Sequence, residues 1–404
     1  MQKKTTFESA GIVIFAISML SSGLNYLFQI LCGRLLNAAD YGQINALFSI
    51  INILVVAGSA LGLSITKHIA ESEKDYGGSV KGIFKQMIWI APLFIAVSTA
   101  IICLLVGADF YTSFIASIST YATALAFIFY SVLQGKKQFL KVGVYNIIQP
   151  AFKFVCGIAL LWIGLSYHSV LYTLSVGALI AMLYGYINAK KEINFLLKPE
   201  SSDIKNVYKY FIFTFISTVC LTIFNNFDVL IIKNFFDETT TGLYSSASLF
   251  GKIILYIPVA FVTMMVPMVA ESKTTDEAIK TLKKTLFYSI GVSGIACAGL
   301  FILRNFIIKL LMGEKFLPAT EYILPVCIMM LMLVCVTVFV NFLIVKNDKW
   351  FTTISCIIAI ITSVVLSIIF HKEVVQIICM LSTVYGLLVF ALLTRIIKNT
   401  KRRI

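Results

Sequence analysis

The stretch SMLSSGLN at residues 18–25 decides the fold, because TVCLTIFN at residues 218–225 repeats its polar positions inside a second apolar segment. A shift of 200 residues places Ser18, Ser22 and Asn25 on Thr218, Thr222 and Asn225. The same shift, without a gap, aligns Gly42 with Gly242, Ala60 with Ala260, and the run Ala70-Glu71-Ser72 with Ala270-Glu271-Ser272. Polar residues that recur in register within apolar segments indicate a membrane chain made of two matching halves.

The composition places the chain in a membrane. Hydrophobic residues make up 59% of it, charged residues 13%, and the mean hydropathy is +0.93. Average soluble chains have about 45–50% apolar and about 25% charged residues. A helix needs about 20 largely apolar residues to cross a bilayer. By that rule we expect an all-α integral membrane protein with twelve spans, at about 11–32, 43–66, 84–107, 111–133, 143–166, 169–188, 208–232, 243–270, 285–308, 321–345, 351–370 and 374–396.

These segments are continuous apolar runs, which favours helices over the alternating ten-residue strands of a membrane barrel. The N-terminal sequence, Met1-Gln2-Lys3-Lys4 followed by an apolar run from Gly11, resembles a signal peptide at first sight. It has no short apolar region that ends in a small-residue cleavage site, so we interpret it as an uncleaved first span.

The basic residues behind the net charge of +14 are unevenly distributed among the loops. If the N-terminus is cytoplasmic, the inner loops and the two termini hold 25 of the 33 Lys and Arg residues, and the outer loops hold 6. The remaining two lie within spans. This is the positive-inside pattern, and it predicts that both termini are cytoplasmic. It accounts for the basic charge without a nucleic-acid partner.

The longest polar stretch, residues 189–207, lies at the midpoint and is expected to link two six-span halves, residues 1–198 and 199–404. Six is an even number of crossings, so both halves have the same orientation and form a parallel pseudo-repeat. The outer loops are short, which argues against a membrane polymerase or glycosyltransferase. The sequence has no Gly-rich phosphate loop, and its nine Cys and three His residues suggest neither a metal site nor a cofactor.

Polar side chains form one stripe on the first span and another on the seventh. Ser18, Ser22, Asn25 and Gln29 lie within about 60° of one another at 100° per residue. The seventh span carries Thr214, Thr218, Thr222, Asn225 and Asp228 on one face. Such stripes either bond neighbouring helices together or line a shared cavity. The carboxylate of Asp228 favours the cavity, because buried ionisable groups are costly and mark transport pathways.

Lys153 is the most informative single residue. It lies in the middle of the fifth span, on the face of Asn146 and Gln149 and beside a kink expected at Pro150. A lysine at that depth costs about 2.5–3.5 kcal/mol on insertion scales, so it needs a partner or a wet cavity. Asp228 is a candidate partner from the other half.

Two further cations have both a simple and a functional interpretation. Lys252, in the span position of Asn52, either extends toward the interface or faces the cavity. Arg34, at the outer end of the first span, is either an interfacial anchor or a cation at the cavity mouth. If both face the cavity together with Lys153, the cavity is net cationic and suits an anionic or phosphate-bearing substrate.

Small residues and prolines predict local packing and bends. Gly58-x-x-x-Gly62 in the second span predicts a close helix contact. Pro258 and Pro267 in the eighth span, and Pro318 and Pro325 around the tenth, predict bends.

Three motifs resemble those of bacterial polysaccharide and O-antigen flippases. The segment 33–42, GRLLNAADYG, resembles their "R-x-L-G-P-x-x-Y-G" turn after the first helix, with Asn37-Ala38 in place of the usual Gly-Pro. Residues 133–139, LQGKKQF, resemble the "L-Q-G-x-x-x-F" end of their fourth helix, and residues 267–271, PMVAE, the proline near the end of their eighth.

The resemblance implies the multidrug/oligosaccharidyl-lipid/polysaccharide exporter fold, in which two six-helix bundles form a V around a central cavity. It implies flipping of a polyprenyl-pyrophosphate-linked oligosaccharide from the inner to the outer leaflet of the bacterial cytoplasmic membrane, with other polysaccharide-assembly membrane proteins as candidate partners. The candidate substrate-binding residues are Arg34, which matches the family motif, and Lys153, Lys252, Asn25, Gln29, Asn225 and Gln149. Asp228 is the candidate ion-coupling residue, for H⁺ or Na⁺.

Two alternatives compete with this interpretation. A cation-coupled multidrug exporter of the same fold predicts an acidic or aromatic cavity, which the excess of Lys over Asp in the spans disfavours. A membrane polysaccharide polymerase is disfavoured by the short outer loops.

Overall fold

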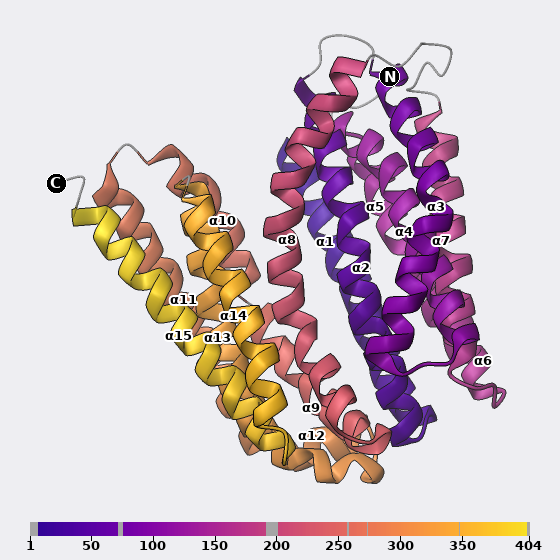
Figure 1. Ribbon diagram of the computed structural model, residues 1–404, viewed down its shortest axis with the longest axis vertical. Helices are drawn as coiled ribbons and strands as arrows, with labels where there is room; N and C mark the ends of the chain where they lie inside the picture. Colours follow the sequence, from indigo (N-terminus) through magenta and orange to yellow (C-terminus); the bar gives the residue numbers. More distant parts are fainter. Residues whose placement is uncertain are drawn as a thin grey trace. The chain divides into compact units, whose positions relative to one another are not determined.

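A computed structural model describes residues 7–71, 76–190, 201–256, 258–272, 274–346 and 348–401, and every regular element within these ranges is helical (Figure 1). The all-α class expected from the sequence is therefore confirmed. The expected boundary between residues 198 and 199 lies outside the described residues.

The described part of the first half contains seven α-helices and one π-helical turn. Their bounds are α1 (Phe7–Leu35), α2 (Ala38–Glu71), α3 (Gly77–Val106), α4 (Phe110–Gly135), α5 (Phe139–Phe152), η1 (Lys153–Gly157), α6 (Ile158–Trp162) and α7 (His168–Ala189). Where it is described, the second half contains eight α-helices and one 3₁₀ turn. Their bounds are α8 (Ser201–Phe235), α9 (Glu238–Tyr256), α10 (Val259–Glu271), α11 (Thr275–Ile302), α12 (Arg304–Leu311), η2 (Glu314–Ala319), α13 (Thr320–Val345), α14 (Lys349–Ile369) and α15 (Val374–Lys401).

Eleven helical segments within the described residues are long and apolar enough to cross a membrane. They overlap the second to twelfth expected spans, and the expected first span falls on α1. The ninth span, expected at 285–308, is Thr275–Ile302, because residues 304–308 belong to the separate helix α12. Large apolar side chains remain on the surface: Trp89, Leu104, Trp162 and Phe287 are 77%, 79%, 82% and 75% exposed. Soluble proteins do not expose apolar surface on this scale, so these side chains face lipid.

The chain forms two compact units. Unit 1 comprises Met1–Leu36 and Ala46–Thr222, and unit 2 comprises Asn37–Asn45 and Ile223–Ile404. Helix α2 therefore begins in unit 2 and continues in unit 1, whereas α8 begins in unit 1 and ends in unit 2.

Unit 1 is built around α4. This helix packs against α3 and α7, while α5 packs against α1 and α7 (Figure 1). One part of the core joins five helices through buried apolar side chains, among them Ile65 of α2, Ile83 of α3, Phe129 of α4 and Val207 of α8. Glycines allow α2 to approach α4 closely, because a Cβ on Gly58 would lie 2.5 Å from the Cα of Ala124. The close contact expected from the Gly58-x-x-x-Gly62 pattern is thus confirmed.

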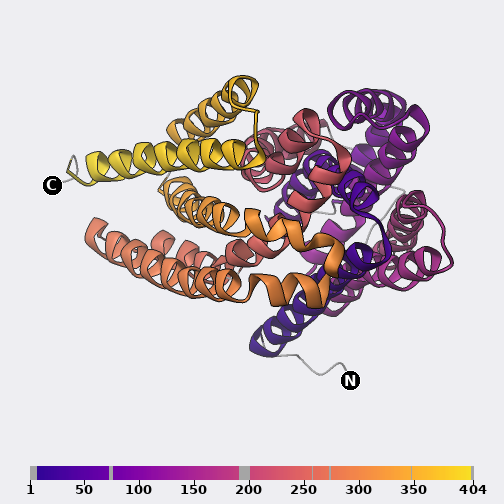
Figure 2. The same cartoon turned by 90° about the horizontal axis from the view of Figure 1, so that it is seen from below.

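Unit 2 is built around α13, which packs against α9, α11 and α15. The C-terminal helix α15 runs unbroken beside α14 (Figure 2). The helix is interrupted beside Pro258, since α9 ends at Tyr256 and α10 begins at Val259, and the bend expected there stays a prediction. Pro318 lies in the 3₁₀ turn that precedes α13. Pro267 and Pro325 lie inside continuous helices.

Candidate functional site

The centre of the site in unit 1 is Lys153, the first residue of the π-helical turn η1. Pro150, three residues earlier in α5, has no backbone N–H and cannot complete the regular hydrogen-bond ladder. A π turn is a common way for a helix to absorb such a disturbance, and π turns are frequent at functional sites. The turn leaves the lysine side chain inside the helix bundle, 8% exposed.

Neutral groups surround the Lys153 ammonium. Its Nζ donates a hydrogen bond to Oδ1 of Asn25 at 2.5 Å. It also lies 4.7 Å from the centroid of the Phe28 ring and 5.3 Å from that of Phe48. Both rings are within the distance at which a cation is attracted to an aromatic face. The structure thus brings together two expected site residues, one from the fifth span and one from the first.

Gln149 lines a cavity of about 110 Å³ one helical turn before Lys153, between α4, α5 and α7. The polar part of its lining comes from Thr123, Tyr145, Asn146 and Gln149. Gln149 Nε2 donates to Oγ1 of Thr123 at 3.3 Å and to the carbonyl oxygen of Leu174 at 3.4 Å, both long for hydrogen bonds. A polar cavity of this size has room for several water molecules.

The other expected residues of the first span lie along α1. Gln29 is half-buried, and its buried Oε1 has no hydrogen-bond partner among the described residues. Arg34 is exposed in the last turn of the helix. The side chain of Ser18 lies outside the described residues, and Ser22 is exposed. Neither interpretation of Arg34, anchor or cavity cation, is tested by this placement.

Unit 2 contains a buried carboxylate. Asp228 in α8 is 1% exposed, and its Oδ2 accepts hydrogen bonds from Tyr244 Oη at 2.7 Å and Ser248 Oγ at 2.8 Å. Its Oδ1 is buried without a hydrogen-bond partner within the described part of the chain. A buried carboxylate oxygen without a hydrogen-bond partner can accept a proton or a cation. The expected pairing of Asp228 with Lys153 stays a prediction, since each group has hydrogen-bond partners within its own unit.

Asn225 and Lys252 also belong to unit 2, and both are half-buried. Asn225 lies three residues before Asp228 on α8, whereas Lys252 lies on α9. Among the described residues, Lys233–Glu238, Lys309–Glu314 and Arg395–Asp348 form ion pairs, and these three pairs contain no expected site residue.

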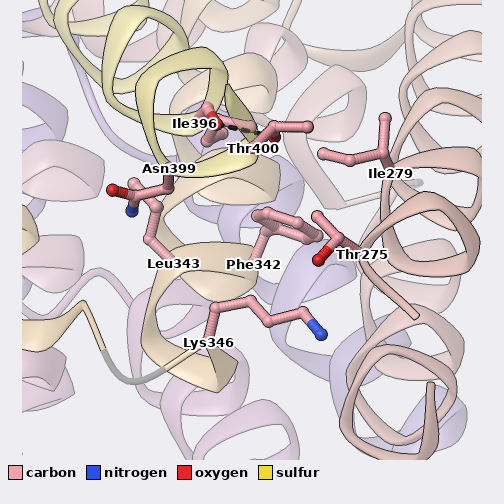
Figure 3. A pocket seen from close by; sticks show the side chains of 8 residues that line it. All are labelled: Thr275, Ile279, Phe342, Leu343, Lys346, Ile396, Asn399 and Thr400. Carbon is pink, nitrogen blue, oxygen red and sulfur yellow. Dashed lines mark hydrogen bonds between the residues drawn. The ribbon is translucent and has the colours of Figure 1, made fainter. Parts of the chain in front are cut away.

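A smaller cavity of about 50 Å³ lies at the ends of α11, α13 and α15 (Figure 3). Figure 3 shows Lys346 and Thr275 at one side of its lining and Ile396 and Thr400 at the other. The Lys346 ammonium donates to Ser272 Oγ at 3.0 Å, beyond the end of α10. A lysine bonded at a helix end stabilises that end, so we regard this cavity as part of the packing and not of the site.

An ion pair ties α15 to the residue before α14. Arg395 donates to both carboxylate oxygens of Asp348, at 2.6 and 3.0 Å, and Asn399 donates to Oδ2 at 2.7 Å. The hydrogen bond from Arg395 is the main reason that the pKa of Asp348 lies below its usual value. No group of three or more His, Cys, Asp or Glu side chains in the described ranges is arranged to hold a metal ion.

Sequence reasoning placed Asn25 in the site but missed the aromatic neighbours of Lys153 and the hydroxyl partners of Asp228. Phe28 follows Asn25 by three residues and therefore shares its helix face, a spacing that could have identified it. Tyr244 and Ser248 are spaced by one helical turn on α9, but nothing in the sequence shows that this turn packs against Asp228. Only the fold supplies that information.

Fold and site together define a multi-pass membrane transporter. The chain aligns with an inward-closed structure of the lipid II flippase MurJ with a TM-score of 0.78 and 16% identity, over 95% of this chain and 87% of that one. It aligns with an inward-facing multidrug resistance transporter of the MATE family, in the MOP superfamily, with a TM-score of 0.77 and 12% identity, over 97% and 99%. At these identities the likeness concerns the fold.

The chain belongs to the polysaccharide biosynthesis protein family, whose model matches residues 9–273. It is also similar to the probable low-salt glycan biosynthesis flippase Agl15 of Haloferax volcanii, with 22% identity over 336 residues, which is 78% of this chain and 70% of that protein. The family resemblance expected from the three motifs is confirmed, and the chain is a transporter and not an enzyme.

Proposed function

We propose that the protein flips a polyprenyl-pyrophosphate-linked oligosaccharide from the inner to the outer leaflet of a bacterial cytoplasmic membrane during surface polysaccharide synthesis. In this proposal twelve helices cross the membrane with both termini in the cytoplasm. The halves, residues 1–198 and 199–404, act as the two six-helix bundles of an alternating-access exporter. The family assignment and the similarity to a glycan flippase support the proposal.

The observation that carries the proposal is the buried charge of Lys153, whose described partners include no carboxylate. Its described partners are the neutral Asn25 side chain and two aromatic rings. A positive charge held inside a bundle without a carboxylate is poorly neutralised and attracts an anion. A pyrophosphate is such an anion, and lysine binds phosphate as a point charge.

The polar side chains of α1 and α5 suit the rest of the substrate. Asn25, Gln29 and Gln149 offer amide donors and acceptors of the kind that bind sugar hydroxyls and phosphate oxygens. Arg34, and Asn225 and Lys252 in unit 2, would contact the substrate at other stages of its passage. The lipid tail would remain among acyl chains.

Asp228 is the proposed coupling residue. Its buried Oδ1 has no described hydrogen-bond partner, while its Oδ2 is held by two hydroxyl groups. Binding of H⁺ or Na⁺ would neutralise the carboxylate, and that change could favour one conformational state over another.

The test is a transport assay in proteoliposomes that contain a fluorescent polyprenyl-pyrophosphate oligosaccharide. Flipping moves the fluorophore out of reach of an impermeant quencher added on one side. Cells that lack the protein should also accumulate the lipid-linked intermediate, which mass spectrometry would identify. Cells that lose the protein but keep normal surface glycan and accumulate no intermediate would contradict the proposal.

The second candidate is a cation-coupled multidrug exporter. The fold it shares with the MATE transporter and the two aromatic rings beside Lys153 favour it. Export of lipophilic cationic dyes by the same proteoliposomes, without flipping of the glycolipid, would support this candidate instead.

A further inference from the structure

The short helix α12 lies between α11 and α13 in the sequence, at one end of unit 2 (Figure 1). Its eight residues, Arg304–Leu311, make a helix of about 12 Å, far short of the roughly 30 Å core of a bilayer. A single residue, Leu303, separates it from α11. Helix α12 is therefore not part of a span, although it is nearly as apolar as the spans on either side of it.

Apolar side chains occupy two opposite sides of α12. Ile308 and Met312 are fully buried, and the helix packs against η2 and α13. Phe306 and Leu310 are 63% and 52% exposed. At 100° per residue, Ile308 points about 160° away from both of them. One side of α12 thus fixes the helix to unit 2, and the other presents apolar side chains outward.

This exposed side continues the lipid-facing surface of α11. Phe287, Ile295 and Ile302 lie within about 80° of one another on α11, and all three are exposed. Ile302 is the last residue of α11, directly before Leu303 and α12. A short helix that carries an apolar surface past the end of a span is suited to the interface between acyl chains and water.

Basic residues accompany the exposed apolar side. Residues 303–319 contain Arg304, Lys309 and Lys315 against one carboxylate, Glu314, a net charge of +2. The proposed orientation places these three among its six outer basic residues, although it keeps most Lys and Arg inside. Lys309 forms an ion pair with Glu314 at 2.6 Å. The guanidinium of Arg304 lies 4.4 Å from the centroid of the Phe301 ring and thus stays near the end of α11.

We propose that α12 is an interfacial helix that binds anionic phospholipids of the outer leaflet. Phe306 and Leu310 insert at the boundary of the acyl chains, while Arg304 and Lys315 contact the headgroup phosphates. A second copy of the chain fits this surface less well, because two segments of charge +2 would meet. The proposal rests on the proposed orientation of the chain and not on the identity of the transported substrate.

The first test measures depth at two adjacent positions with opposite expected surroundings. Asn305→Cys and Phe306→Cys are made in a chain freed of its nine native cysteines, labelled with an environment-sensitive fluorophore and reconstituted in vesicles. Lipids spin-labelled near the headgroup should quench the label at position 306, whereas a water-soluble quencher should reach the label at 305. Phe287→Cys is the control for a deep position, since Phe287 lies near the middle of α11. A label at 306 that only the water-soluble quencher reaches would overturn the proposal.

The second test measures the preference for anionic lipid. In vesicles of equal parts phosphatidylglycerol and phosphatidylcholine, spin-labelled phosphatidylglycerol should quench the label at 306 more than spin-labelled phosphatidylcholine. The preference should fall by up to about fivefold for each cation removed by Arg304→Gln and Lys315→Gln. Lys372→Gln removes a basic residue from another outer loop and should leave the preference unchanged. Equal quenching by the two lipids would refute the binding of anionic lipid.

The remaining measurements separate this proposal from its alternatives. A membrane-impermeant maleimide added to spheroplasts should react with the Asn305→Cys variant, and reaction only after lysis would refute the outer placement. Cross-linking of two copies through position 306, without quenching by lipid, would overturn the proposal in favour of a dimer. No readout requires transport. A parent protein that flips no glycolipid while its label at 306 is quenched by lipid would refute the proposed function and leave α12 as proposed.

Discussion

Replacement of Lys153 by methionine separates a transport role from a structural one. Lys153→Met keeps the length and flexibility of the side chain and removes its charge. We expect it to abolish flipping of the glycolipid, because the pyrophosphate loses its cation in unit 1. We expect the fold to survive, because the charge contributes little to stability on balance.

The small expected effect on stability follows from weighing the cost of burying the ammonium group against its favourable contacts. A lysine at mid-membrane depth costs about 2.5–3.5 kcal/mol. The hydrogen bond to Asn25 contributes about 1.5–3 kcal/mol, since one partner is charged. The rings of Phe28 and Phe48 contribute about 0.5–1 kcal/mol each. At the midpoints of these ranges the contributions cancel to within about 1 kcal/mol, so Lys153→Met should change the free energy of unfolding by about 1 kcal/mol.

The variant to compare with Lys153→Met is Asn25→Leu, which keeps the charge and removes its hydrogen-bond acceptor. It removes the acceptor and leaves the ammonium buried against the rings, which should lower the free energy of unfolding by about 1.5–3 kcal/mol. Thermal unfolding in detergent and flipping in proteoliposomes measure the two effects separately. The reasoning would be refuted if Lys153→Met transported at the parent rate, or if it unfolded at a lower temperature than Asn25→Leu.

Three further predictions concern other parts of the chain. Asp228→Asn should fold and lose any dependence of transport on Na⁺ or pH, whereas Asp228→Ala should lose about 2–5 kcal/mol of stability in thermal unfolding, because two buried hydroxyl groups lose their acceptor. Gly58→Leu should lower the melting temperature, at a cost of about 1–3 kcal/mol, because its Cβ would meet the backbone of Ala124. Because Arg395 lowers the pKa of Asp348, the pair stabilises the fold fully above the usual aspartate range and loses this effect as the pH falls through the lowered pKa. The difference in melting temperature between the parent and Asp348→Asn should therefore shrink from pH 7 toward about pH 3, and an unchanged difference would contradict this.

The spans were predictable because every helix that crosses a bilayer needs about 20 largely apolar residues. Length and hydropathy located most helices, although α11 begins ten residues before the expected start of the ninth span at 285, and Pro258 located the break between α9 and α10. The identity of the buried charges was also predictable, since a lysine or an aspartate inside an apolar run stands out in any sequence.

The surroundings of those charges were harder to predict. Asn25 was expected in the site, but its bond to Lys153 depends on how α1 packs against α5. Likewise, the hydroxyl groups of Tyr244 and Ser248 reach Asp228 only because α8 and α9 meet at one particular rotation. Hydropathy carries no information on rotation, because lipid and protein interiors accept the same apolar side chains.

The π turn at Lys153–Gly157 bears on the history of the duplicated chain. Each such turn holds more residues than an α-helical turn, as an inserted residue would produce. Beyond the insertion, every side chain is rotated by about 100° relative to an uninterrupted helix. The fifth span of the second half, α14, is α-helical throughout. An alignment of the two repeats is therefore expected to open a gap of one residue near Lys153.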